Sequence, residues 1–216
     1  MLRRLSHAFA GGTLTAIHGP SGVGKTTLLS AIVGLVPTSA GRIVREGRDL
    51  SGVAPRRRGV AWMPQGGGLY PHLTVRQSLR IGFGHRSTVR WRRRRRDVGA
   101  EASIEAVAAS AGIEDWLDRY PDQISGGQAR RASVVKAMFG PKPVCLLDEP
   151  FAQLDDDAVD RLADAVVGWH RHRVDRHGVG AVTVLVTHRV AVARRIADDV
   201  VRLRRDGSSD RLEPSS

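Results

Sequence analysis

A glycine-rich loop between an apolar strand and a helical segment constrains the fold of this chain most. The apolar run Leu14–His18 is followed by Gly-Pro-Ser-Gly-Val-Gly-Lys-Thr, which is Gly19–Thr26, and by a helical pattern over Lys25–Val33 that Gly34 ends. A phosphate-binding loop requires this order of strand, loop and helix. Because such loops lie at the carboxyl end of a parallel strand, the segment predicts an α/β fold with a mainly parallel sheet.

The loop carries its own binding chemistry. Backbone N–H groups of Gly22–Lys25 can surround the α- and β-phosphates, and the N-terminus of the next helix favours the same anion. The Lys25 ammonium would reach the β- and γ-oxygens, Thr26 would bind Mg²⁺, and Thr27 would lie near the α-phosphate. A chance glycine turn is the alternative, but the flanking strand and helix disfavour it. The candidate phosphate-binding residues are Gly19, Pro20, Ser21, Gly22, Val23, Gly24, Lys25, Thr26 and Thr27.

Two adjacent carboxylates follow a second apolar strand, Val144–Leu147. Ligands of parallel sheets bind at the carboxyl ends of strands, and Mg²⁺ takes few carboxylates because phosphate and water complete its shell. We therefore expect Asp148 to act on Mg²⁺ through water. Glu149 would be the general base or would position the attacking water. A purely structural carboxylate pair is the alternative.

Apolar runs and helical patterns alternate along the rest of the chain. A stretch from about 76 to 120 is helical in pattern, and we expect it to be a subdomain inserted between two parts of one α/β domain, 1–75 and 121–206. The polar tail 207–216 is expected to be disordered. The other expected strands are Arg42–Val44, Val60–Met63, Val182–Thr187 and Val200–Leu203, the last in an edge hairpin, and the other expected helices are Thr74–Ile81, Glu101–Ala111, Gly126–Phe139, Asp157–His170 and Val190–Ile196.

Composition narrows the class of protein. The 216 residues contain no apolar run of membrane-spanning length and a single cysteine, Cys145, so the sequence predicts a cytosolic chain without an intrachain disulfide. The net charge is +12, from 34 Lys and Arg against 22 Asp and Glu. Such a balance can attract nucleic acid or an anionic membrane. A biased composition spread over solvated faces is the simpler interpretation.

Two local clusters each allow more than one interpretation. The run Arg90–Arg96 fits a solvated helix face, a lipid headgroup contact or nucleic acid. The histidines His170, His172 and His177 alternate with arginines, which disfavour a bound cation, and we expect them in a loop.

A further set of motifs completes a family pattern. Ser125-Gly126-Gly127-Gln128 opens a helix ahead of the strand that ends at Asp148, and Gln65, Leu154-Asp155 and His188 occupy the remaining positions of the pattern in order. With the phosphate loop and the carboxylate pair, the chain resembles an ABC-type ATPase over nearly its whole length. The resemblance implies a P-loop NTPase core with helices on both faces, an inserted α-helical subdomain and a small antiparallel β edge.

The resemblance also implies a role for each motif. Gln65 would contact Mg²⁺ and water and report to a membrane partner. Ser125 and Gly127, within Ser125–Gln128, would contact the γ-phosphate of ATP bound by a second protomer. Asp155 would lie in the loop linking the two ATP sites, and His188 would sense the γ-phosphate.

The implied cofactors are ATP and Mg²⁺. The implied partners are a second ABC ATPase subunit in a homodimer or heterodimer, transmembrane permease subunits and a substrate-binding protein, at the cytoplasmic face of the membrane; no specific nucleic acid is expected. Leu69–Val75 would help to form a groove for a coupling helix of the permease, or is a hydrophobic junction with Thr74 as N-cap. A soluble ABC ATPase acting on nucleic acid or ribosomes, and a regulatory subunit with little turnover, are the alternatives.

The chain departs from the family pattern at three places. Only residues 1–18 precede Gly19, so His7 or Phe9 would have to replace the aromatic that stacks on adenine. Ile124 replaces a leucine of similar volume, which is expected to be harmless. Gly66–Gly68 follows Gln65, which predicts an unusually flexible segment there.

Overall fold

The computed structural model describes residues 5–83, 98–204 and 209–212. Its centre is a six-stranded sheet in the order β4-β5-β6-β1-β7-β8. All neighbouring pairs are parallel except β7 and β8, which pair as an antiparallel edge. The predicted α/β fold class is thereby confirmed. The strands are β1 (Leu14–His18), β4 (Val60–Met63), β5 (Val144–Asp148), β6 (Val182–Val186), β7 (Asp199–Leu203) and β8 (Ser209–Leu212).

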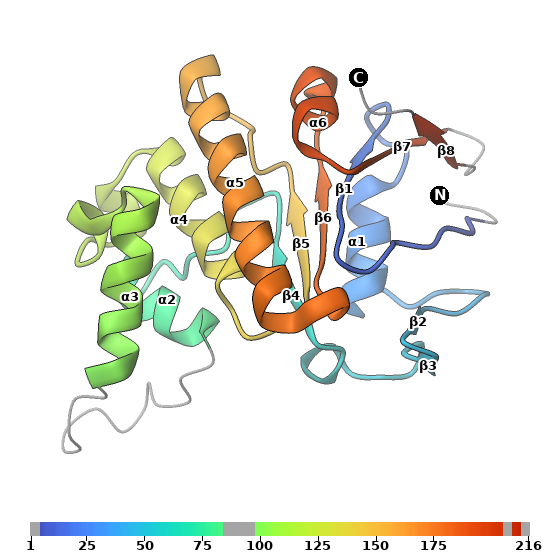
Figure 1. Ribbon diagram of the computed structural model, residues 1–216, viewed down its shortest axis with the longest axis horizontal. Helices are drawn as coiled ribbons and strands as arrows, with labels where there is room; N and C mark the ends of the chain where they lie inside the picture. The colour runs from blue at the N-terminus through green and yellow to red at the C-terminus, as the bar shows by residue number, and fades with distance from the viewer. Residues whose placement is uncertain (1–4, 84–97, 205–208, 213–216) are drawn as a thin grey trace.

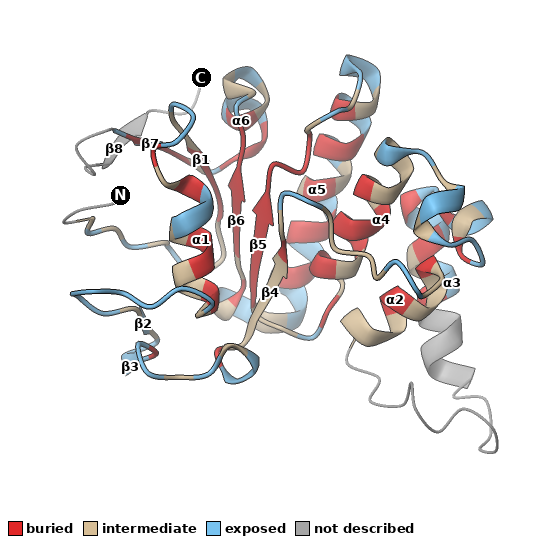
Figure 2. Ribbon diagram, turned by 180° about the vertical axis from the view of Figure 1, so that it is seen from behind, coloured by how far each residue is buried: buried red, intermediate tan, exposed pale blue. Residues whose placement is uncertain are grey.

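Helices cover both faces of the sheet (Figure 1). Alternate residues of β5 show why: Val144 and Leu146 join a buried cluster with α1, whereas Cys145 and Leu147 join the larger cluster with α4 and α5. Successive side chains of a strand point to opposite faces, so a strand covered twice must be apolar throughout. Figure 2 shows β5 buried along its length. The helices are α1 (Lys25–Val33), α2 (Val75–Gly82), α3 (Val98–Ala111), α4 (Gly126–Met138), α5 (Asp156–His177) and α6 (Val190–Ile196).

Short elements connect these layers. In the described part of the chain, four 3₁₀ turns and a two-stranded antiparallel hairpin lie in the connections. None of the helices in the described parts of the chain is long and apolar enough to cross a membrane. The turns are η1 (Pro55–Arg57), η2 (Glu114–Trp116), η3 (Pro121–Gln123) and η4 (Gly178–Gly180), and the hairpin strands are β2 (Val44–Arg45) and β3 (Arg48–Asp49).

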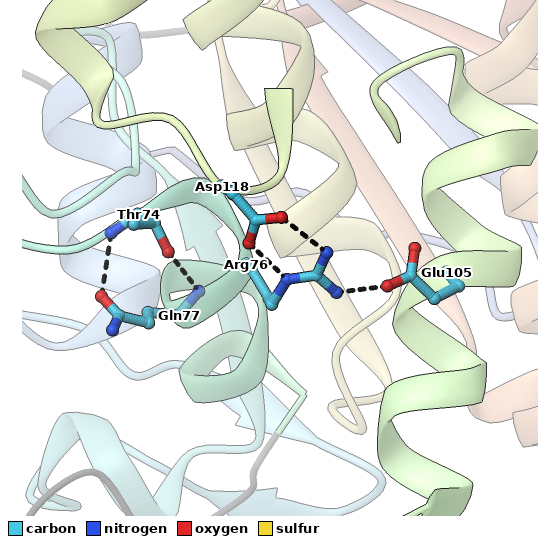
Figure 3. A network of polar contacts seen from close by, with 5 residues as sticks. All are labelled: Thr74, Arg76, Gln77, Glu105 and Asp118. Atoms are coloured by element: carbon cyan, nitrogen blue, oxygen red, sulfur yellow. Dashed lines mark hydrogen bonds and ion pairs between the residues drawn. The ribbon is translucent and has the colours of Figure 1, made fainter. Parts of the chain in front are cut away.

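The helices α2 and α3 lie beside α4, at the end of the molecule remote from β8 (Figure 1). A polar network connects α2 with α3 and with the segment that follows α3 (Figure 3). Arg76 donates to both carboxylate oxygens of Asp118, at 2.7 and 3.1 Å, and also to Glu105 of α3. Thr74 is the N-cap of α2, as expected, and forms a reciprocal capping box with Gln77.

Three sequence predictions about these elements are corrected. The strand expected at Arg42–Val44 is instead the β2–β3 hairpin, which turns at Glu46 and Gly47 with φ of 51° and 78° and stays separate from the main sheet. Residues Ser209–Leu212 of the tail expected to be disordered form β8. The helix expected to end at His170 continues to His177, so the three histidines lie on α5 and not in a loop. The pattern was obscured because its inward positions include the polar His170 and Arg173, which are buried.

Three arginines of the described part of the chain, Arg58, Arg130 and Arg173, are exceptions to the expected spread of charge over solvated faces, because they are buried. Arg58 is 4% exposed and donates to the carbonyls of Ala31 and Ile32 at the end of α1. Arg173 is 2% exposed and donates to Met138 at the end of α4 and to Lys142 and Pro143 beyond it. The last carbonyls of a helix have no intrahelical partner and carry partial negative charge, so a guanidinium satisfies them well. The Arg90–Arg96 run lies outside the described residues.

Candidate functional site

The phosphate loop lies between β1 and α1, as the sequence predicted. Gly24 is the N-cap of α1 with φ of 102°, a backbone conformation that residues other than glycine rarely adopt. At Gly19 a Cβ atom would lie 2.6 Å from the Leu203 carbonyl oxygen, so β7 closes the space behind the loop. The Lys25 Nζ donates to the carbonyls of Gly19 and Pro20, at 2.8 and 3.0 Å. The ammonium is therefore held inside the loop, where a phosphate would compete with these two carbonyls.

The two carboxylates end β5 and differ in their surroundings. Asp148 is fully buried, and within the described part of the chain neither of its oxygens has a hydrogen-bond partner. Burial raises its pKa, an effect that the nearby Thr26 hydroxyl and the charges of Lys25 and Arg130 oppose. The site thus presents an acceptor pair that is ready for a cation or a donor.

Glu149 has a left-handed backbone, with φ of 53°. Its Oε1 lies 3.3 Å from Nε2 of His188, which follows β6. Burial raises the pKa of Glu149, while His188 and Lys25 act in the opposite direction. A carboxyl group with a raised pKa beside an imidazole is suited to accept a proton from water.

These groups share one cavity of about 260 Å³. It brings the phosphate loop together with Gln65 after β4, the two carboxylates after β5 and His188 after β6. All of them lie at the carboxyl ends of neighbouring strands, where parallel sheets bind ligands. The lining residues are Ser21, Gly22, Gly24, Lys25, Thr26, Thr27, Gln65, Asp148, Glu149, Val186 and His188.

The Ser125–Gln128 turn does not line this cavity. Ser125 is the exposed N-cap of α4 and forms a capping box with Gln128. A Cβ added to Gly126 would meet nothing within 4 Å, so the helix N-terminus is open to an outside group. The structure therefore separates the Gly19–Thr26 loop from the Ser125–Gln128 turn within one chain.

The other candidate residues also lie outside the cavity. Asp155 is the N-cap of α5 and accepts from the Ala158 amide at 2.7 Å. Phe9 packs against the buried cluster around α1, with its ring centroid 4.7 Å from that of His7. Ile124 packs against the larger core cluster.

Sequence reasoning missed Arg130 and misjudged the segment after Gln65. Arg130, on α4, donates from one nitrogen to the carbonyls of Gln65 and Glu149, at 2.8 and 3.1 Å. Gly68 is bonded through its amide to Ser133, at 2.9 Å, and through its carbonyl to Lys136. The segment expected to be flexible is thus tethered to α4. The two adjacent arginines after Gln128 look alike in the sequence, so nothing there distinguishes the buried one.

Comparisons with known proteins show the family of the chain. The ABC transporter family profile matches residues 2–152. The sulfate/thiosulfate import ATP-binding protein CysA of Mycobacterium tuberculosis (strain ATCC 25618 / H37Rv) is 38% identical over 192 residues, covering 89% of this chain and 51% of that protein. The thiamine import ATP-binding protein ThiQ of Vibrio vulnificus (strain YJ016) is 35% identical over 189 residues, covering 86% of this chain and 74% of that protein.

A solved structure agrees in fold. The dimeric ATP-binding cassette MJ0796 bound to ADP and Pi superposes with a TM-score of 0.80 at 22% identity, covering 98% of this chain and 90% of that chain. The present chain spans about half the length of the CysA relatives it matches. On the family profile and the ThiQ match, the chain belongs to the ABC transporter family.

Proposed function

We propose that this chain is the ATP-hydrolysing subunit of an ABC transporter and couples ATP binding and hydrolysis to movement of a substrate through separate membrane subunits. The observation that carries the proposal is the single cavity that joins the Lys25 loop to Gln65, Glu149 and His188. A triphosphate in that loop would place its γ-phosphate beside the carboxylates. The relatives named above are importer subunits, which favours transport over a soluble ATPase acting on nucleic acid.

The residues present fit a magnesium ion. Asp148 offers two buried oxygens without hydrogen-bond partners among the described residues, and Thr26 and Gln65 line the same cavity. Mg²⁺ prefers such a sparse set of oxygen ligands because phosphate and water complete its shell. When bound, the ion would neutralise charge on the β- and γ-phosphates. Thr26, Gln65 and Asp148 are the residues that would hold it.

The chain's own groups account for the hydrolytic step. Lys25 would exchange the carbonyls of Gly19 and Pro20 for phosphate oxygens. Glu149 would accept a proton from the attacking water. The water oxygen would bond to the γ-phosphorus while the bond between the γ-phosphorus and the oxygen that leaves with ADP breaks. His188, 3.3 Å from Glu149, would hold that carboxylate in position.

A second copy, or a related subunit, would complete the site. Ser125–Gln128 opens outward from α4 and lies outside the chain's own cavity, so it is available to ATP held by a partner. We propose a head-to-tail dimer of this kind, with Asp155 in the linking loop, at the cytoplasmic face of the membrane. Permease subunits and, for import, a substrate-binding protein would be the other partners.

Glu149→Gln tests the assignment of the base. The variant keeps size and hydrogen bonding but cannot take the proton, so kcat for ATP hydrolysis should fall by about 10²–10⁴-fold. ATP affinity, measured with a fluorescent nucleotide, should stay within about threefold, because the phosphate loop is untouched. Glu114→Gln, at an exposed position of η2, is the matched control. A Glu149→Gln variant that hydrolyses ATP like the wild type would refute the assignment.

A further inference from the structure

Three side chains of α4 hold the main chain of the segment that follows β4. Arg130, Ser133 and Lys136 recur every third residue, so they lie on one side of the helix. Arg130 donates to the Gln65 carbonyl, Ser133 accepts from the Gly68 amide, and Lys136 donates to the Gly68 carbonyl. We call these three residues the α4 clamp. Each end of the segment from Gln65 to Gly68 is thus fixed to the same helix.

Burial makes these contacts expensive to break. Arg130 is 9% exposed and Ser133 is 2% exposed. Burial also lowers the pKa of Lys136 to about 8, and its Nζ lies 3.8 Å from the centre of the Tyr70 ring. Within the described part of the chain neither Arg130 nor Lys136 is paired with a carboxylate, so backbone carbonyls are their hydrogen-bond acceptors. A buried cation that loses its acceptors has no water to replace them.

Arg130 extends the clamp to the main chain of Glu149, the proposed base. The nitrogen that donates to the Gln65 carbonyl also donates to the Glu149 carbonyl, at 3.1 Å. Glu149 has a left-handed backbone, and its Oε1 lies 3.3 Å from Nε2 of His188. A displacement of Arg130 would therefore act on the main chains of both Gln65 and Glu149.

We propose that Arg130 is a positioning residue, and that the α4 clamp makes the main chains of Gln65 and Glu149 move with α4. The functional consequence of the α4 clamp rests on the proposed function. The N-terminus of α4, Ser125–Gln128, would face the partner's ATP, and Arg130 follows less than one turn later on the same rigid helix. Nucleotide bound by the partner would thereby adjust the geometry of water attack in the chain's own cavity.

The first test does not depend on hydrolysis. Amide exchange of Gly68, followed by NMR, reports the bond to Ser133 directly. Ser133→Ala should raise that exchange rate about tenfold, because the amide loses a buried acceptor. Amides of β5 in the same sample are the internal reference. Unchanged protection of Gly68 in this conservative variant would overturn the clamp, whether or not the protein hydrolyses ATP.

The second test separates positioning from binding. Arg130→Met should lower kcat about tenfold or more while KM for ATP stays within about threefold, because the carbonyls of Gln65 and Glu149 lose a charged donor. Arg130→Lys should recover part of that loss, since an ammonium can donate to two carbonyls but reaches less far. Arg161→Met, exposed on α5, removes the same charge and should match the wild type.

Failure of the proposed role of Arg130 and the α4 clamp can be distinguished from failure of the proposed function. A wild type without ATPase activity would refute the proposed function, and Gly68 exchange would still decide on the clamp. An Arg130→Met variant that is folded by circular dichroism and keeps kcat within about twofold would overturn the positioning role. A parallel loss of kcat in Arg130→Met and Arg130→Lys, with a lowered melting temperature in both, would assign Arg130 a purely structural role and overturn it as well.

Discussion

Removing the charge of Asp148 should stabilise the nucleotide-free protein while abolishing its magnesium-dependent activity. The carboxylate is fully buried, and neither oxygen has a hydrogen-bond partner within the described residues. Burying an ion costs several kcal/mol even after relaxation. The Thr26 hydroxyl and the charges of Lys25 and Arg130 offset only part of this cost, because the pKa of Asp148 is still raised. An asparagine amide left unpaired costs about 1–3 kcal/mol.

The difference favours Asp148→Asn by about 2 kcal/mol at neutral pH. For a chain of this size that corresponds to a rise of about 4–8 °C in melting temperature. The sign of the pH dependence follows from linkage. Because the pKa of Asp148 is raised in the folded state, the folded protein still holds this proton at pH values where the unfolded carboxyl has lost it. The wild type therefore loses stability as the pH rises from the unfolded pKa to the folded pKa. The advantage of the variant should therefore vanish below the ordinary carboxyl pKa and grow toward neutral pH.

Thermal unfolding without Mg²⁺ or nucleotide, followed by circular dichroism from pH 4 to 8, measures this difference. Asp115→Asn, at an exposed position of η2, is the matched control and should show no such trend. With Mg²⁺ and ATP present the order should reverse, because a ligand stabilises the form that binds it. A variant that is less stable than the wild type at pH 8, or whose advantage grows as the pH falls, would refute the reasoning.

Two stability predictions concern other elements. Arg173→Met should lower the free energy of unfolding by about 2–4 kcal/mol, because the carbonyl at the end of α4 and two carbonyls beyond it lose a buried charged donor, although the desolvation cost of the guanidinium is also removed. Urea unfolding with an unchanged m-value measures this change, and a loss below about 1 kcal/mol would contradict the prediction. Thr74→Ala should lower the free energy of unfolding by about 1 kcal/mol through loss of the α2 capping box, measured by the same method. Thr74→Ser should be nearly neutral, and a loss of stability equal to that of Thr74→Ala would count against a capping role.

Local features of the chain predicted much of the architecture. The bounds of β1, α1, β4 and α6 agree with the sequence predictions, because apolar runs and glycine ends report local backbone preference. The helix α5 was predicted seven residues too short at its end, His170 in place of His177. Its buried positions carry His170 and Arg173, whose partners come from other parts of the chain, so no local pattern identifies them as inward-facing.

The sequence by itself indicated the family, which the family profile confirms, and it predicted the chemistry. Each motif is a short run of residue types suited to the phosphate, the metal or the water that it would contact. Tertiary structure decided how the motifs relate. It places Gln65, Glu149 and His188 in one cavity, leaves Ser125–Gln128 outside it, and connects the two places through Arg130. Arg130 and Gln65 are 65 residues apart. A contact of that separation depends on how α4 packs against the sheet, and the buried arginine that makes it looks in the sequence like its neighbour.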